Sequence, residues 1–190
     1  MNFISKLFLI LIFSTIFNAC KKGCTDPEAY NYNINRTIDN GSCKYYQSVS
    51  LDSVRVYSFP ELNNQNQGWD AGYSSDIDSN NTFPDLFLGF ISPTNYVNNN
   101  LTYVYNDVNP FIVDYTFELM PKLTSTQWIN LGYWIYLYDL EYDNSFEPID
   151  SVYLEPFDNY GSSRSERFKT SMSVNQGFNN LNLEAYFSWQ

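Results

Sequence analysis

The stretch that decides the fold is residues 133–154, which read YWIYLYDLEYDNSFEPIDSVYL. It begins as an alternating strand, with Ile and Leu on one face and Trp and Tyr on the other. Five carboxylates and no cation follow in twelve residues: Asp139, Glu141, Asp143, Glu147 and Asp150. Side chains at i and i+2 of a strand point the same way, so Asp139 and Glu141 should aim at one point, where their repulsion favours an intervening water or metal ion. We interpret the loop as a candidate calcium clasp at one end of a β-sandwich.

The rest of the chain after residue 48 has the pattern of short strands. Breakers rich in Pro, Gly, Asn and Ser separate the strand-like runs, and no helical periodicity lasts beyond a turn or two. This spacing is typical of an all-β, antiparallel sandwich and predicts eight strands. The expected strands are residues 49–59, 86–91, 101–105, 111–119, 133–140, 151–154, 168–174 and 181–189.

Composition excludes several classes of function. The chain has 10 Lys+Arg against 21 Asp+Glu, and Arg55 and Lys122 are the only cations between residues 51 and 160. Nucleic-acid affinity comes from clusters of Lys and Arg, so nucleic acid is not an expected partner. The chain also has no histidine, which removes Ser-His-Asp, Cys-His and HExxH chemistry.

An apolar leader precedes the first cysteine. Lys6 is followed by an apolar run over residues 7–13 that continues to Phe17. This run has the length of the core of a secretory signal and is shorter than the roughly 20 residues that a membrane-spanning helix needs. We therefore expect residues 1–19 to be a cleaved signal peptide.

The junction after the leader reads Phe17-Asn18-Ala19-Cys20 and is followed by two lysines. It resembles the lipobox of bacterial lipoproteins, with Phe17 where leucine is more usual. The resemblance implies that Cys20 is the lipidated first residue of the mature chain, held at the bacterial outer membrane or cell surface by acyl chains. The alternative is a plain signal peptide in which Cys20 is incidental.

Cys24 and Cys43 bracket a segment rich in Gly, Asn and Asp. In an exported protein such a pair is most simply a disulfide, and closing a loop of about 20 residues contributes roughly 3 kcal/mol in the chain-entropy model. Residues 23–45, GCTDPEAYNYNINRTIDNGSCKY, resemble a short repeat of Bacteroidetes surface proteins that contains GCTDP, NYNP and DDGSC. We expect residues 20–48 to be an anchor followed by a disulfide-closed stalk.

The stalk contains Asp and Asn side chains with two possible roles. Their oxygens could bind calcium, or the side chains could form turns and caps, as they do in many proteins. We favour caps, because Asn40 removes a charge that the repeat usually has. The candidates are Asp26, Asn31, Asn33, Asn35 and Asp39.

The acidic loop resembles the third calcium loop of the C2 domain, an eight-stranded sandwich. The usual form is Asp-x-Asp-x5-Asp-x-Ile-Gly, and this chain has Asp139-x-Glu141-x5-Glu147-x-Ile149, with Asp150 in place of glycine. The resemblance implies a C2-like sandwich over residues 49–190.

Two upstream segments resemble the first calcium loop of C2 domains. These are Trp69-Asp70 and residues 84–88, PDLFL, in which the familiar Asp-Pro order is inverted. The resemblance implies calcium as the bound ion. The implied ligands are Asp70, Asp85, Asp139, Glu141 and Glu147.

Two other interpretations of these carboxylates stay open. A solvated acidic loop would keep an aromatic-rich protein soluble. Alternatively, a carboxylate pair could serve a glycoside hydrolase. Nothing in the loop distinguishes one carboxylate from the others, so no catalytic residue is assigned.

Three aromatic residues outside the expected strands are candidate ligand contacts: Trp69, Tyr73 and Trp128. Exposed Trp and Tyr beside carboxylates combine stacking with hydrogen bonding, as sugar-binding modules do. The favoured alternative is that these rings pin long loops to the sandwich.

These observations predict a non-enzymatic, lipid-anchored envelope protein. Its calcium-stabilised sandwich would bind an extracellular protein or glycan. A carbohydrate-binding module is the second hypothesis, and a carboxylate-dependent hydrolase is the third. The C2 resemblance also implies calcium-dependent phospholipid binding, but the excess of carboxylates in residues 51–160 would repel anionic headgroups.

Overall fold

The computed structural model of this chain describes residues 21–70, 83–91, 102–111, 114–125, 132–141, 143–157, 168–175 and 180–190. These residues divide into two compact units, one within residues 21–46 and one within residues 47–157 and 168–190. The expected signal peptide and Cys20 lie outside the described residues. No described helix is long and apolar enough to cross a membrane.

The N-terminal unit is closed by the expected disulfide. Cys24 and Cys43 are bonded, with their Cα atoms 4.7 Å apart. Two short strands, β1 (Lys22–Gly23) and β2 (Ile38–Asp39), pair in parallel beside it. The pairing of the two cysteines, predicted from export and from the composition of the segment between them, is confirmed.

Asp and Asn side chains of this unit cap its turns. Asn31 accepts a hydrogen bond from the backbone N–H of Lys44 and donates one to the carbonyl of Ser42, which ties the chain together next to the disulfide. Gly41 precedes Ser42 with φ of 72°, in the left-handed region that glycine adopts without strain. The interpretation that these side chains bind nearby backbone groups is therefore confirmed for Asp26, Asn31, Asn33 and Asp39. Four side chains each accept a hydrogen bond from the N–H two residues further on, at 2.9–3.1 Å: Asp26, Asn33, Asp39 and Asn40.

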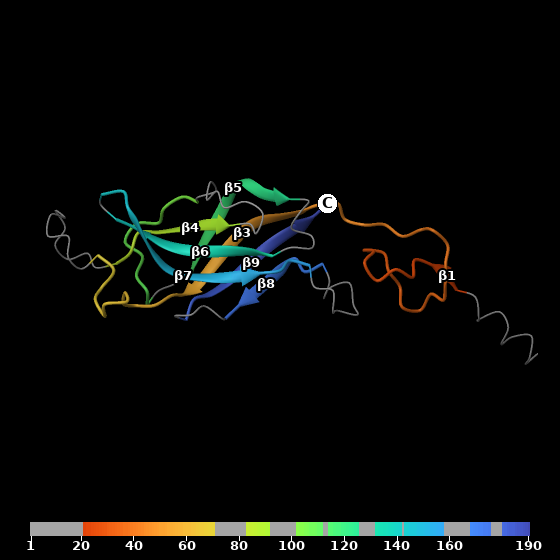
Figure 1. Ribbon diagram of the computed structural model, residues 1–190, viewed down its shortest axis with the longest axis horizontal. Coiled ribbons are helices and arrows are strands. Elements are labelled where there is room, and N and C mark those ends of the chain that lie inside the picture. Colours follow the sequence, from red (N-terminus) through yellow and green to blue (C-terminus); the bar gives the residue numbers. More distant parts are fainter. Residues whose placement is uncertain are drawn as a thin grey trace, which may run out of the picture. The chain divides into compact units, whose positions relative to one another are not determined.

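The second unit is an antiparallel β-sandwich, as the sequence predicts. One sheet has the strand order β5-β3-β9-β8 and the other β4-β6-β7, and every pair in both sheets is antiparallel. Figure 1 shows the smaller sheet lying across the larger one. The strands are β3 (Val49–Ser58), β4 (Leu86–Ile91), β5 (Tyr115–Ser125), β6 (Tyr133–Leu140), β7 (Phe146–Leu154), β8 (Ser171–Val174) and β9 (Asn182–Trp189).

Alternating side chains of both sheets form one hydrophobic core. In β3 the residues Val54 and Val56 point inward, and in β6 Ile135 and Leu137 do the same. These side chains pack with partners from the other strands, such as Leu183 of β9. The period of two along each strand places aliphatic residues between the sheets, where their burial supplies most of the stabilisation.

The strands differ from the expected ones in several places. Three of them begin at other residues than expected: β5 at Tyr115, β7 at Phe146 and β8 at Ser171. Residues 101–105 do not form a regular strand within the described residues; they contribute an isolated bridge between Leu86 and Tyr105. By contrast, β5 continues past Pro121, where a breaker was expected. This is possible because β5 is an edge strand whose register shifts between Glu118 and Leu123, so proline replaces no required ladder hydrogen bond.

Candidate functional site

Asp139 is the central residue of the acidic end of the sandwich. It continues the inward-facing series of Ile135 and Leu137 in β6, and its side chain is therefore fully buried, with 0% exposed. The backbone N–H of Asp85 donates a hydrogen bond of 2.7 Å to Oδ1 of Asp139. Among the described residues, the other oxygen, Oδ2, has no hydrogen-bond partner. An unpartnered, buried carboxylate oxygen is costly and calls for an explanation.

Glu141 lies two residues further on and is also buried, with 9% exposed. Its backbone N–H donates to the carbonyl of Ser145, and its own carbonyl accepts from Asn144, which closes the turn between β6 and β7. Its Oε2 atom, like Oδ2 of Asp139, has no hydrogen-bond partner in the part of the chain that the structure describes. Two neighbouring carboxylates of this loop thus each present a buried, unpartnered oxygen.

The other expected ligands approach from three segments. Asp85 precedes β4, where its carbonyl accepts from the N–H of Leu140 and its Oδ1 accepts from the N–H of Asp107. Glu147, in β7, lies directly opposite Asp139 in the strand register. Asp70 is half-buried in the segment that follows β3. Asp107 was not predicted to be part of this region, because it belongs to none of the sequence motifs that resemble calcium loops.

The carboxylates around Asp139 and Glu141 influence the ionisation of both groups. Burial raises the pKa of Asp139 to about 8, the hydrogen bond from Asp85 opposes this rise, and the negative charges of Asp70, Glu141 and Asp85 add to it. Burial also raises the pKa of Glu141, and the charges of Glu147, Asp143 and Asp85 reinforce the shift. The charges of Asp70 and Asp85 thus act on Asp139, and that of Glu147 acts on Glu141.

The donor chemistry of this cluster suits calcium, but the carboxylates do not form a closed cage. All the expected ligands offer hard oxygen atoms, which calcium prefers. Among the described residues, however, no three acidic or cysteine side chains are placed so that they could hold a metal ion together. Binding of an ion at the two unpartnered oxygens must therefore be accompanied by side-chain movement.

Trp69 has the loop-pinning role that was the favoured alternative to ligand contact. Its ring is buried in the core of the sandwich, and its Nε1–H donates a hydrogen bond of 2.9 Å to the carbonyl of Pro60. This contact holds the segment after β3 against the sandwich. The other two candidate contacts, Tyr73 and Trp128, lie outside the described residues.

The outer face of the β4-β6-β7 sheet is aromatic. No function was predicted for this face from the sequence. Neighbouring rings are spaced at 5.3 Å between Trp134 and Tyr153, 6.2 Å between Trp134 and Tyr136, and 5.7 Å between Tyr136 and Tyr138. The signal was present in β6, where Trp and Tyr occupy alternate positions that polar residues usually fill on a solvated sheet face.

Comparisons with known proteins found similarity to solved structures, but not to family models or curated proteins. No family model and no curated protein matches this chain. A structure of human GIVD cytosolic phospholipase A2 in complex with methyl gamma-linolenyl fluorophosphonate is similar over 75% of this chain and 17% of that chain, with 12% identity and a TM-score of 0.43. A C2 domain of plant extended synaptotagmin 1 is similar over 75% of this chain and 93% of that domain, with 10% identity and a TM-score of 0.40. This chain thus spans a small part of the phospholipase.

Proposed function

We propose that this chain is a lipid-anchored, non-enzymatic binding protein of the bacterial cell surface, with a sandwich stabilised by calcium at its acidic end. The observation that supports calcium most directly is the pair of buried oxygens without hydrogen-bond partners, Oδ2 of Asp139 and Oε2 of Glu141. The residues that would hold the ion are those two together with Asp70, Asp85 and Glu147.

Electrostatics explain why an ion would stabilise the fold. The ion-free protein holds Asp139 in a buried place among other carboxylates, and its pKa of about 8 reflects the cost of ionising it there. A divalent cation relieves that cost, because it supplies positive charge where the carboxylates repel one another. Binding and folding are then linked, since only the folded chain brings these residues together.

Burial also supports a binding role rather than catalysis by this cluster. A general acid must reach the proton acceptor of its substrate within hydrogen-bond distance. Asp139, the carboxyl group whose pKa would suit such a role, is fully buried. The chain also has no histidine to act in its place. A hydrolase at this end of the sandwich is therefore the weaker hypothesis.

Calcium is expected to raise the thermal unfolding midpoint of the sandwich. Extracellular calcium modules bind with dissociation constants of about 10⁻⁴ to 10⁻³ M. At about 5 mM calcium the folded state should then gain roughly 1 to 2.5 kcal/mol, or about 3 to 10 °C in the midpoint. The measurement is differential scanning calorimetry of the purified protein with chelator, calcium or magnesium at matched ionic strength.

Magnesium is the control for this experiment. It dehydrates reluctantly and requires nearly octahedral geometry, so it should stabilise the protein less than calcium does. Equal midpoints in calcium and magnesium would mean that the cluster responds only to ionic strength and divalent charge. The interpretation as a solvated acidic loop would then replace the calcium site.

Anchoring through Cys20 predicts a specific labelling result. Cells that express the protein and grow with a clickable palmitate analogue should label the wild type and should not label Cys20→Ser. Cys24→Ser is the matched control and should keep the label, because Cys24 is bonded to Cys43 in the stalk. A labelled Cys20→Ser protein would contradict the anchor.

A carbohydrate-binding module is the second candidate function. The observation that favours it is the aromatic outer face of the β4-β6-β7 sheet. This face contains none of the proposed calcium ligands, so the two functions can be tested separately.

A further inference from the structure

The aromatic face has an exposed part and a buried part. Tyr153 and Phe146 of β7 are 41% and 52% exposed, and Trp134 and Tyr136 of β6 are half-buried. Phe87 of β4 is buried, and its ring makes a T-shaped contact with that of Phe146. The four accessible rings form what we call the aromatic platform: Trp134, Tyr136, Phe146 and Tyr153.

The platform is held in place before any ligand binds. The ring of Tyr153 packs at 5.3 Å from that of Trp134. Its hydroxyl end also lies directly over Gly132, so closely that a Cβ atom at this position would overlap with it. Rings that are fixed in this way lose little conformational freedom on binding, which favours affinity from a small contact area.

The chemistry of the platform limits the ligands that fit it. The strands β4, β6 and β7 contain no lysine or arginine, and the chain carries a net charge of −11. A polyanion such as nucleic acid, an acidic polysaccharide or an anionic lipid surface would be repelled. Tyrosine hydroxyls among the rings offer hydrogen bonds, so an occupant with both apolar faces and hydroxyl groups is favoured over a purely apolar one.

The size of the platform argues against a protein partner. Three strands about 4.8 Å apart and about 3.3 Å of length per residue give a face of roughly 300 Å². A stable protein–protein interface buries about 800 Å² on each partner. The accessible rings next to Trp134 lie 5.3 Å (Tyr153) and 6.2 Å (Tyr136) from it, a spacing that instead suits a chain of sugar rings, each of which covers about one aromatic side chain.

We infer that the aromatic platform binds an uncharged polysaccharide, whose sugar rings stack on Trp134 and Tyr153 and extend along β6 over Tyr136. The inference deepens the proposed binding function by naming the ligand class and its surface. It involves no calcium ligand, so the platform should bind its ligand in the presence of chelator as well.

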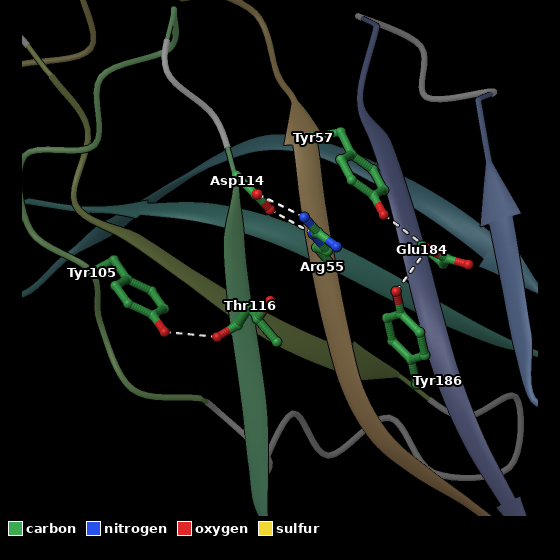
Figure 2. Close-up of polar contacts among 7 residues, drawn as sticks. All are labelled: Arg55, Tyr57, Tyr105, Asp114, Thr116, Glu184 and Tyr186. Atoms are coloured by element: carbon green, nitrogen blue, oxygen red, sulfur yellow. Dashed lines mark hydrogen bonds and ion pairs between the residues drawn. The ribbon is translucent and has the colours of Figure 1, made fainter.

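The outer face of the opposite sheet supplies a matched control. There Tyr57 and Tyr186 both donate hydrogen bonds of 2.8 Å to Glu184, and Arg55 pairs with Asp114, as Figure 2 shows. The polar groups of this face are thus engaged with one another. Tyr57 is 39% exposed, nearly the same as Tyr153. Tyr57→Ala therefore removes an equally exposed ring from outside the platform.

The experiment is native gel electrophoresis of the purified protein through gels that contain hydroxyethyl cellulose, laminarin, galactomannan or amylopectin, with chelator present. At least one of these neutral polysaccharides should retard the wild type, and alginate should not. Trp134→Ala and Tyr153→Ala should each weaken the association roughly tenfold, as the loss of a central aromatic contact does at other interfaces. Tyr57→Ala should migrate as the wild type does, and Tyr153→Phe, which keeps the stacking ring, should be retarded more than Tyr153→Ala.

Several results would overturn the inference. One is unretarded migration of the wild type in all four neutral polysaccharides. Another is that Tyr57→Ala and Tyr153→Ala lose the same amount of retardation relative to the wild type. Sedimentation of the wild type as a dimer and of Tyr153→Ala as a monomer would assign the platform to a second copy of this chain. None of these results would bear on the calcium shift, which has its own measurement.

Discussion

Asp139→Asn is expected to stabilise the protein in chelator and to destabilise it, relative to the wild type, in calcium. In the ion-free state the variant replaces a buried carboxyl group that is costly to ionise, while its Oδ1 still accepts the hydrogen bond from the N–H of Asp85. Its Nδ2 replaces the unpartnered Oδ2 and offers a donor to the surrounding carboxylates. In calcium the same change removes a ligand, so the wild type gains stability that the variant lacks.

The pH dependence of this effect follows from the raised pKa. Asp139 has an ordinary pKa of 3.8 in the unfolded chain and about 8 in the folded one. The folded state therefore binds the proton more tightly, so the stability that Asp139 contributes is complete below about pH 4 and is lost as the pH rises to about 8. The variant has no titrating group at position 139. Without calcium, its free energy of unfolding should therefore exceed that of the wild type by an amount that grows across this pH range to a few kcal/mol, as an order of magnitude.

The measurement is urea unfolding of wild type and variant at pH 5 and pH 8, each with chelator or calcium. Asp143→Asn is the matched control, because it changes an exposed carboxylate of the same turn. The pKa of Asp143 is held low by hydrogen bonds from Ser145, so this variant should gain nothing as the pH rises. A stability difference between Asp139→Asn and the wild type that is the same at both pH values would contradict the buried, protonated state of Asp139.

The sequence predicted the architecture well where side-chain alternation is regular. In β6 the alternation of aliphatic and aromatic residues located a strand with one face in the core, and the structure gives the same residues, Tyr133–Leu140. The boundaries of β5 and β7 were less accurate. Proline at position 121 and the acidic residues before Ile149 are poor strand formers by themselves, and pairing with neighbouring strands overrides that local preference.

The sequence predicted only part of the candidate site, because the site also depends on contacts between distant segments. Spacing along one strand was enough to place Asp139 and Glu141 on the same side, but it could not show that both would be buried. Burial depends on contacts between segments far apart in the sequence, such as the hydrogen bond from the N–H of Asp85 to Asp139. The aromatic platform had a visible pattern in β6, but its partner ring Tyr153 comes from the register with β7.

Loss of the disulfide is expected to unfold the N-terminal unit and leave the sandwich folded. Within residues 21–46 the buried hydrophobic side chains are those of Cys24 and Ala29, so the unit lacks an apolar core of its own. Units this small usually need a disulfide or a metal. The double variant Cys24→Ser, Cys43→Ser removes a cross-link that spans 19 residues, which contributes about 3 kcal/mol in the chain-entropy model.

Limited trypsin digestion distinguishes the two units. Arg36 packs its side chain against Gly23 and lies between the two cysteines, so cleavage after Arg36 should become much faster in the double variant and in the reduced wild type. Lys122 of β5 serves as the internal reference, because the sandwich forms a separate unit and its cleavage rate should not change. Equal cleavage after Arg36 in variant and wild type would mean that the capped turns hold the unit without the cross-link. Faster cleavage at both positions would instead mean that the sandwich depends on the stalk for its stability.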